Sequence, residues 1–190
     1  SFISAINYFL KIYKNKKLTK QDIANLSCKI EMLNLKRNCG KQDQFISTFG
    51  GIRELIIDKS GKVKIKKINI KNYILKKIQN SLAIFYTGYT RSSELILASQ
   101  KKFFENNKTE KNKIMKEIEK IGHRTKKFFV NGDIENLGVL CRKHWNLKKK
   151  LTPLMSSPII DSIYREGIEN GAEGGKILGA GGGGYIMFYI

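Results

Sequence analysis

A run of small residues near the end of the chain sets the tightest limit on its structure. From Gly179 to Gly184, five of six positions are glycine and the sixth is Ala180. Apolar runs flank this stretch at 177–178 and 185–190, and both are typical of strands. Glycine loses more conformational freedom on folding than any other residue, so such a run implies positive φ or a closely approaching group. Phosphate is a frequent ligand of such loops, and a purely structural tight turn is the alternative.

The spacing Gly179-x-Gly181-x-x-Gly184 matches the dinucleotide-binding fingerprint, but its context does not. That fingerprint opens a helix within a βαβ unit, whereas a strand is predicted here. A P-loop is excluded because no Gly-Lys pair in the chain is followed by Ser or Thr. A protein-kinase glycine loop should precede a catalytic loop and a metal-binding Asp, and the printed sequence has neither after this point. By itself the run predicts a close-approach site of undetermined class.

Length and composition narrow the class of protein. A chain of 190 residues with 41% hydrophobic residues can form one large domain or two small ones. No apolar run reaches the roughly 18 residues of a membrane-spanning helix, and the opening segment lacks the basic start and cleavage site of a signal peptide. The three cysteines, Cys28, Cys39 and Cys141, have no metal-binding spacing and cannot all pair. A reducing cytoplasm without membrane association is therefore the expected location.

The formal net charge of +20 invites a nucleic-acid interpretation. The positive residues are spread along the whole chain, however, and most are lysine, which serves bidentate recognition poorly. The chain is also rich in Asn, Ile, Phe and Tyr, as expected from an AT-rich gene, and AAA lysine codons then explain the charge without a partner. Nucleic acid is not the expected ligand, and a basic RNA-binding protein without enzymatic activity remains the alternative.

The periodicity of apolar residues predicts an α+β fold, because helices and hairpins are mixed rather than repeated as βα units. Helix 2–13 is apolar nearly all round and is expected to be buried. The segment Thr19-Lys-Gln-Asp22 resembles a capping box. The predicted elements are, in order, helix 2–13, helix 19–35, a hairpin of 52–57 and 63–70, strand 82–86, helices 92–105, 109–129, 133–150 and 158–170, then strand, glycine loop and strand.

The second predicted helix holds a carboxylate on an unusual face. At about 100° per residue, Glu31 lies about 120° from the apolar stripe of this helix. The stripe consists of Ile23, Leu26, Ile30 and Leu33, and the flank around Glu31 consists of Ala24, Ser27, Cys28 and Leu35. This small, uncharged flank predicts burial on two sides, and a desolvated carboxylate is costly unless it meets a cation or a metal. An exposed glutamate at the edge of the helix is the alternative.

A second candidate carboxylate is Asp43, which stands between two glutamines just after Gly40. A glycine pair, Gly50 and Gly51, closes this segment. One interpretation is a carboxylate held by flanking amides at a pocket floored by bare backbone. The other is that Asp43 is the N-cap of a short helix that Gly50 terminates.

Taken together, these segments resemble the GHMP small-molecule kinase family. Gly-Lys-Gln-Asp-Gln-Phe around Asp43, with Glu31 upstream, is similar to the galactokinase branch, and 176–184 resembles the family's third motif, Lys-x-x-Gly-Ala-Gly-Gly-Gly. The branch that phosphorylates D-glycero-D-manno-heptose 7-phosphate is closer still, along nearly all of the chain. Its further segments here are Phe49-Gly-Gly51, Tyr86-Thr-Gly-Tyr-Thr-Arg91, His144-Trp-x-Leu-Lys-Lys and Gly174-Gly-Lys-Ile-Leu-Gly-Ala-Gly.

The resemblance implies roles for particular residues. Asp43 would accept or orient the proton of the substrate hydroxyl, and Glu31 with Ser1 would bind Mg²⁺. Gly50, Gly51 and Arg91 would contact the sugar or its 7-phosphate. The third motif would lie against the active site and help to hold the phosphates of ATP. Its residues are Gly179, Ala180, Gly181, Gly182, Gly183 and Gly184.

The resemblance also implies a fold and a reaction. The fold would be the two-layer GHMP kinase fold, with the rest of a ribosomal-protein-like N-terminal domain in 1–75 and a ferredoxin-like C-terminal domain in 76–190. The reaction would transfer the γ-phosphoryl group of ATP to the anomeric hydroxyl of the heptose phosphate, as in lipopolysaccharide or capsule synthesis. Galactokinase, fucose kinase and mevalonate kinase activities are the near alternatives. The implied cofactors are ATP and Mg²⁺.

The chain departs from the family pattern at its start. The principal ATP loop, Pro-x-x-x-Gly-Leu-Gly-Ser-Ser, should stand immediately before the first helix, and Ser1-Phe-Ile-Ser-Ala resembles only its last serine and the helix that follows. The N-terminal strands, the first motif and the closing residues of the last strand have no counterpart here. Because the ATP phosphates would lose their main cradle, we expect no kinase activity from these residues alone.

Overall fold

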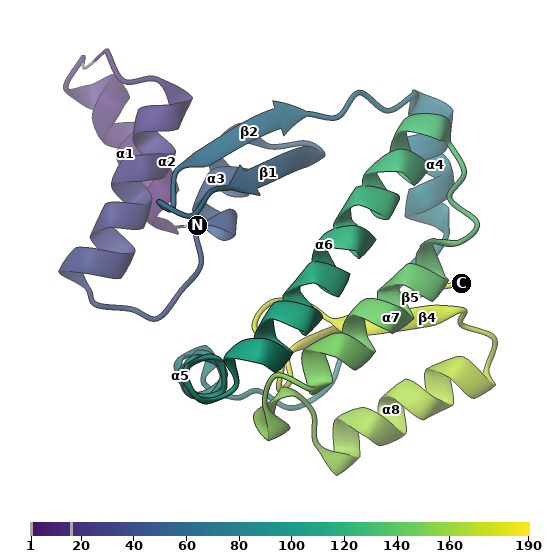
Figure 1. Ribbon diagram of the computed structural model, residues 1–190. Coiled ribbons are helices and arrows are strands. Elements are labelled where there is room, and N and C mark those ends of the chain that lie inside the picture. Colours follow the sequence, from purple (N-terminus) through teal and green to yellow (C-terminus); the bar gives the residue numbers. More distant parts are fainter. Residues whose placement is uncertain (1, 16) are drawn as a thin grey trace. The chain divides into compact units, whose positions relative to one another are not determined.

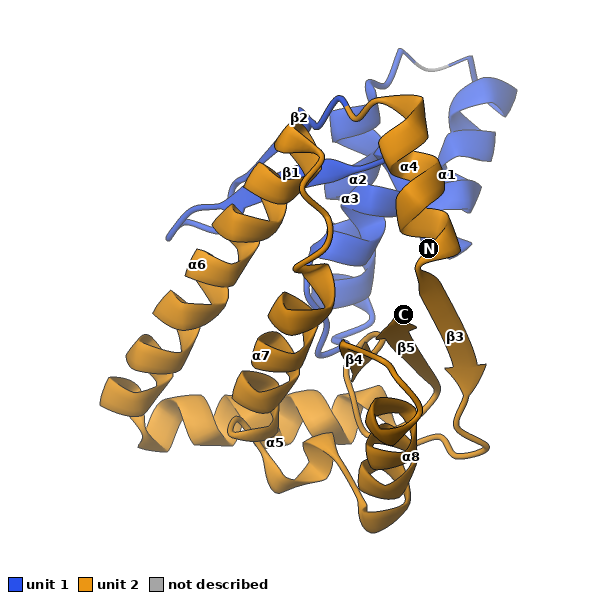
Figure 2. Ribbon diagram, turned by 90° about the vertical axis from the view of Figure 1, so that its right-hand side faces the viewer, with its two compact units in different colours: residues 1–69 blue, residues 70–190 orange. Residues whose placement is uncertain are grey.

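The computed structural model describes residues 2–15 and 17–190 (Figure 1). The chain divides into two compact units, residues 1–69 and residues 70–190 (Figure 2). Ser1, one of the predicted metal ligands, lies outside the described residues. The mixture of helices and antiparallel strands confirms the predicted α+β class.

The first unit combines helices with one β-hairpin. Its elements are α1 (Phe2–Tyr13), α2 (Lys20–Lys29), a π-helical turn η1 (Ile30–Asn34), α3 (Gln42–Phe49), β1 (Arg53–Ile57) and β2 (Val63–Lys67). The two strands pair antiparallel with Leu55 opposite Ile65, and Asp58 Oδ1 accepts hydrogen bonds from the backbone N–H groups of Ser60 and Lys62 in the turn. The predicted hairpin is confirmed, with its second strand ending at residue 67 rather than 70.

The first helix is present, but the prediction that it is buried is wrong. Phe2 is 81% exposed and Phe9 is 62% exposed, whereas the buried residues of α1 are Ser4 and Asn7. Asn7 Nδ2 donates a hydrogen bond of 3.0 Å to Ser27 Oγ on α2. The small polar face of α1 therefore meets α2, and its large apolar residues point outward.

The second helix also buries a different face from the one that its apolar stripe predicts. The capping box is confirmed, since Asp22 N–H donates to Thr19 Oγ1 and Thr19 N–H donates to Asp22 Oδ2. The buried residues are Ile23, Ala24, Ser27 and Cys28, while Leu26 and Leu33 of the stripe are exposed. Small side chains let α1 and α3 approach this helix closely, which explains why the small flank is buried together with Ile23 of the stripe.

The second unit is a three-stranded antiparallel sheet, in the order β3-β5-β4, covered by helices. Its elements are α4 (Asn72–Asn80), β3 (Leu82–Tyr86), α5 (Ser93–Asn106), α6 (Lys108–Asn131), α7 (Leu137–Lys149), a 3₁₀ turn η2 (Pro153–Met155), α8 (Pro158–Glu169), β4 (Gly174–Ile177) and β5 (Tyr185–Tyr189). The predicted strands and helices are present, whereas α4 was not predicted. No helix in the part of the chain that the structure describes is long and apolar enough to cross a membrane.

The core of the second unit joins α7 and α8 to the sheet. Trp145 and Ile160 are fully buried and pack with Ile186 and Phe188 of β5. A smaller cluster joins α4 to α7 and β5. Helix α7 lies along β4 (Figure 1), and a Cβ atom on Gly174 would come within 2.0 Å of the Gly138 carbonyl oxygen. This contact between backbones lies at the N-terminal end of α7. From there the helix runs along β4, so its C-terminal half lies next to the glycine loop that follows the strand.

Candidate functional site

Glu31 lies where α2 widens into the π-helical turn η1. The backbone N–H of Leu35 donates to the Ile30 carbonyl at 2.9 Å. This bond spans five residues instead of the four of an α-helix, so the turn is wider. Such π-type turns occur frequently at functional sites. Glu31 is half-buried, and its predicted neighbours Ala24 and Ser27 are fully buried. The turn therefore presents a partly desolvated carboxylate.

Asp43 lies in the first turn of α3 rather than at its cap. The N-cap residue is Lys41, so the prediction of Asp43 as N-cap is wrong, whereas Gly50 ends the helix as predicted, with φ of 65°. Asp43 is exposed, and its carboxylate makes no hydrogen bond or ion pair with any other residue that the structure describes. A carboxylate in this position is stabilised by the helix dipole and is available to a ligand.

The two predicted carboxylates lie near the same thiol. Burial raises the pKa of Cys39, and the negative charges of Glu31 and Asp43 raise that pKa further. Within the first unit, Glu31 and Asp43 thus lie within electrostatic reach of one thiol. Among the described residues, no group of three His, Cys, Asp or Glu side chains could hold a metal ion unaided. A cation at Glu31 and Asp43 would need further oxygen ligands from substrate phosphates or water, as Mg²⁺ commonly has.

The glycine loop is packed against its own unit through its central residues. Gly181, Gly182 and Gly183 are buried, and a Cβ atom on Gly183 would lie 2.5 Å from the Tyr89 carbonyl oxygen. The Gly182 N–H donates to the Met155 carbonyl at 2.9 Å. The closely approaching group that the sequence predicts is, for these three glycines, the protein's own backbone and side chains. Gly179 is exposed and has no neighbour within 4 Å of an added Cβ.

Arg91 belongs to a segment that holds the glycine loop in place. The Gly184 N–H donates to the Tyr89 carbonyl at 2.7 Å, and Thr87 Oγ1 donates to the Gly184 carbonyl at 2.9 Å. Arg91 Nε donates to Tyr89 Oη at 2.9 Å, and its guanidinium lies 5.5 Å from the centre of that ring. The structure therefore brings together two of the predicted site elements of the second unit.

The glycine pair predicted to contact the substrate lies in the first unit. Gly50 and Gly51 follow α3 at the end opposite Asp43, and both are exposed with φ near 65°. Arg53 Nε donates to the Gly50 carbonyl at 2.7 Å. The pair thus ends the helix, and a contact with substrate stays a prediction.

A cationic group that was not predicted from the sequence lies beside the glycine loop. Lys148 is half-buried, and its Nζ donates to the Gly179 carbonyl at 3.1 Å. Burial lowers the pKa of Lys148, and the charge of Lys176 on β4 lowers it further. The detectable pattern was the four-residue spacing from His144 to Lys148, which places both on one face of a helix.

His144 gives this region a pH-dependent stability. Burial lowers the pKa of His144 to about 4, and the charges of Lys176 and Lys148 contribute to the same shift. Between pH 4 and the ordinary pKa of 6.5, the unfolded chain binds a proton that the folded chain does not, so stability falls as the pH drops through this window. We expect the titration of His144 to lower the free energy of unfolding by about 3 kcal/mol between pH 7 and pH 4.

Urea unfolding of the wild type and His144→Gln between pH 7 and pH 4 measures this contribution. The variant should lose less stability than the wild type, because its side chain does not titrate. The exposed His123 supplies the control, and His123→Gln should follow the wild-type curve. Identical pH curves for His144→Gln and wild type would contradict the expected shift.

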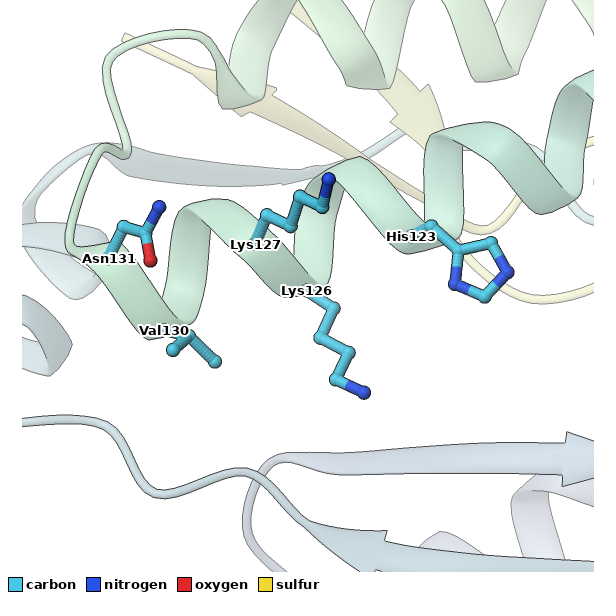
Figure 3. Close-up of a pocket in the computed structure, with 5 residues that line it drawn as sticks. All are labelled: His123, Lys126, Lys127, Val130 and Asn131. Carbon is cyan, nitrogen blue, oxygen red and sulfur yellow. The ribbon is translucent and has the colours of Figure 1, made fainter.

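A separate hollow lies along α6 and is lined by His123, Lys126, Lys127, Val130 and Asn131 (Figure 3). Figure 3 shows Lys126 and Val130 on one side of the helix and Lys127 and Asn131 on the other. The lining side chains do not converge on one point, and none of them is a predicted site residue. The hollow therefore offers no constellation for catalysis.

Comparison with known proteins finds similarity to GHMP kinases. Residues 125–189 match the family model described as GHMP kinases C terminal. The chain is 29% identical over 176 residues to D-glycero-alpha-D-manno-heptose 7-phosphate kinase of Campylobacter jejuni, which covers 93% of this chain and 51% of that protein. The chain thus spans about half the length of this curated relative.

Two solved structures share the fold. L. major mevalonate kinase in complex with R-mevalonate is 20% identical with a TM-score of 0.75, and the match covers 100% of this chain and 55% of that one. A D-glycero-D-manno-heptose 1-phosphate kinase from Bacteroides thetaiotaomicron is also 20% identical, with a TM-score of 0.66 and coverage of 96% and 48%.

Proposed function

We propose that this chain serves the ATP-dependent phosphorylation of a sugar phosphate, because it shares the fold of GHMP kinases and its residues 125–189 match the model of the GHMP kinase C-terminal domain. The observation that carries the proposal is the exposed carboxylate of Asp43, which has no internal partner among the described residues. Asp43 stands in the segment Gly-Lys-Gln-Asp-Gln-Phe. The match to the heptose 7-phosphate kinase covers 93% of this chain and includes that segment. We place this activity in the cytoplasm, where ATP is available.

We propose that the acceptor is the anomeric hydroxyl of D-glycero-D-manno-heptose 7-phosphate. The similarity to the Campylobacter jejuni kinase supports this choice over the other activities of the family. A galactokinase, fucose kinase or mevalonate kinase activity is the alternative. The mevalonate kinase structure matches this chain with a TM-score of 0.75, against 0.66 for the heptose 1-phosphate kinase. In the proposed reaction, the acceptor oxygen bonds to the γ-phosphorus as the bond to the ADP oxygen breaks.

Asp43 would accept the proton of the acceptor hydroxyl as the new bond forms. Phosphoryl transfer depends on positioning and charge neutralisation more than on covalent help, so one well-placed carboxylate and ordered donors are sufficient. Gly50, Gly51 and Arg91 would contact the acceptor, and the exposed edge of the loop at Gly179 and Ala180 would face phosphate.

Mg²⁺ would neutralise charge on the phosphates of ATP. The residues that would hold it are Glu31 and Ser1, the second of which lies outside the described residues. Magnesium commonly uses one or two protein carboxylates together with phosphate oxygens and water. A half-buried Glu31 near Asp43 fits such a site.

A phosphorylation assay with the purified gene product that carries these residues tests the proposal. We expect ATP-dependent conversion of D-glycero-D-manno-heptose 7-phosphate to a bisphosphate, with kcat/KM at least about tenfold higher than for galactose, fucose or mevalonate, a difference of about 1.4 kcal/mol in transition-state binding. A preference for galactose, fucose or mevalonate would assign the chain to that kinase activity instead. Turnover of none of them would overturn the proposal.

A further inference from the structure

We propose that Gln44 is a positioning residue for Asp43. Its buried amide fixes the rotation of α3 about the helix axis, and thereby the direction in which the Asp43 carboxylate points. The inference rests on the proposed role of Asp43 in phosphoryl transfer and deepens it. All of the residues that carry it lie within the first unit.

Asp43 and the buried side chains of α3 lie on opposite faces of the helix. Asp43 is exposed, whereas Gln44 and Phe45 are 1% and 0% exposed. At about 100° per residue, Phe45 lies about 160° from Asp43 around the helix axis. Any rotation of α3 in its packing therefore turns the carboxylate through the same angle.

Of the two buried side chains, only Gln44 makes a directional contact. Phe45 packs with apolar side chains of α2 and β2, and apolar contact of this kind is non-directional. The Gln44 amide donates from Nε2 to Cys39 Sγ at 3.9 Å. Cys39 lies in the segment between η1 and α3. This hydrogen bond therefore ties the rotation of α3 to the segment that leads into it.

Gln44 also carries a buried acceptor without a partner. Its Oε1 accepts no hydrogen bond from the residues that the structure describes. Such an acceptor costs free energy, and an apolar side chain of similar shape would avoid that cost. Stability therefore does not explain an amide at this position. A group that lowers stability is typical of a site that function maintains.

The junction of α1, α2 and α3 is polar on the side of α1 as well (Figure 1). Ser4 Oγ donates to the Gln44 carbonyl at 3.5 Å, and Asn7 Nδ2 donates to α2 at 3.0 Å. Both residues face inward although Phe2 and Phe9 of the same helix are exposed. Buried polar contacts specify one packing arrangement where apolar contacts allow several.

The effect of Gln44 on Asp43 passes through the helix and not through a direct contact. The Asp43 carboxylate makes no hydrogen bond with any described residue, so the neighbouring amide does not hold it. A general base must lie within hydrogen-bond reach of the proton that it accepts, and a displacement of about 1 Å can cost about 10²-fold in rate. A loosened α3 would therefore lower kcat without removing a group that binds substrate.

Gln44→Met in the gene product that carries these residues separates positioning from stability. Methionine keeps the length of the side chain and removes the amide. We expect kcat to fall about tenfold or more, with KM within about twofold of wild type, while the midpoint of urea unfolding stays the same or rises. Gln79→Met is the control, because Gln79 is exposed on α4, and it should leave kcat, KM and the midpoint unchanged. Wild-type kcat in Gln44→Met would overturn the proposal.

The carboxyl carbon-13 signal of Asp43 reports the surroundings of this side chain without substrate. In protein labelled at aspartate, the signal is assigned with Asp43→Asn. It should shift in Gln44→Met and keep its wild-type position in Gln79→Met. An unchanged signal would overturn the proposal, because any loss of kcat would then have a cause other than the position of Asp43. Should the wild type turn over none of the acceptors, the proposed function fails, and this signal still decides the role of Gln44.

Two variants of Cys39 decide the question if Gln44→Met does not fold. Cys39→Ser keeps an acceptor for the Gln44 amide, whereas Cys39→Ala removes it. We expect kcat of Cys39→Ala to be about tenfold below that of Cys39→Ser, with the same shift of the Asp43 signal. Equal kcat values and equal Asp43 signals in the two variants would contradict the positioning role.

Discussion

Replacement of Asp43 by asparagine is expected to lower kcat for phosphoryl transfer by about 10²- to 10⁴-fold, with a smaller change in KM. This range is typical of removing a general base. Asparagine has nearly the same shape as aspartate but cannot accept a proton from the substrate hydroxyl. Because the Asp43 side chain is exposed and makes no hydrogen bond or ion pair among the described residues, the substitution should leave folding intact.

The measurement is steady-state kinetics with the gene product that carries this chain, alongside thermal unfolding of each variant. Asp133→Asn is a matched control, since Asp133 is also exposed and makes no ion pair with a described residue. The control should retain wild-type kcat. Should Asp43→Asn retain more than about half of wild-type kcat, Asp43 would have no role in proton transfer.

Substitution of Gly183 by alanine is expected to destabilise residues 70–190 by about 3 to 5 kcal/mol. Gly183 has φ of 145°, a conformation that side chains rarely adopt, and the new Cβ would lie 2.5 Å from the Tyr89 carbonyl oxygen. The obstacle is backbone rather than a flexible side chain. Relief of the clash would disturb the Gly184-to-Tyr89 hydrogen bond that holds the loop.

Urea unfolding followed by the fluorescence of Trp145, the only tryptophan, measures the effect in the unit that contains the loop. Gly179→Ala is the matched control, because Gly179 also has positive φ but has open space around it. It should cost about 1 kcal/mol, the penalty of the left-handed conformation alone. Equal destabilisation by both substitutions would show that packing against Tyr89 does not restrain the loop.

Most elements of this fold could be predicted from the chain itself. The hairpin around Asp58, the capping box at Thr19 and the strands flanking the glycine loop all depend on local chemistry, and all are present. Helix α4 escaped prediction because only Ile74 and Ile78 of its nine residues face the core. Two apolar residues one turn apart give too short a pattern to distinguish a helix from a loop.

The candidate site could be predicted in part. Glu31 and Asp43 were recognisable from residue type and neighbours, and the structure places both near Cys39. The cationic group of Lys148 and Lys176 could not be recognised. Its members stand 28 positions apart in a chain full of lysine, and only the packing of α7 along β4 brings them together.

The glycine run separates most clearly what the local sequence determines from what only the tertiary structure determines. Five glycines in six positions determined that the backbone would take positive φ or be closely approached, because glycine does both at the lowest steric cost. Only the folded unit decided that the approaching groups are Tyr89 at Gly183 and Met155 at Gly181, and that Gly179 faces outward. Likewise, periodicity gave α1 and α2 their helical form, but the exposed Phe2 and Leu33 show that it did not select the buried face. Conformation follows from local sterics, whereas burial depends on which distant elements pack against each face.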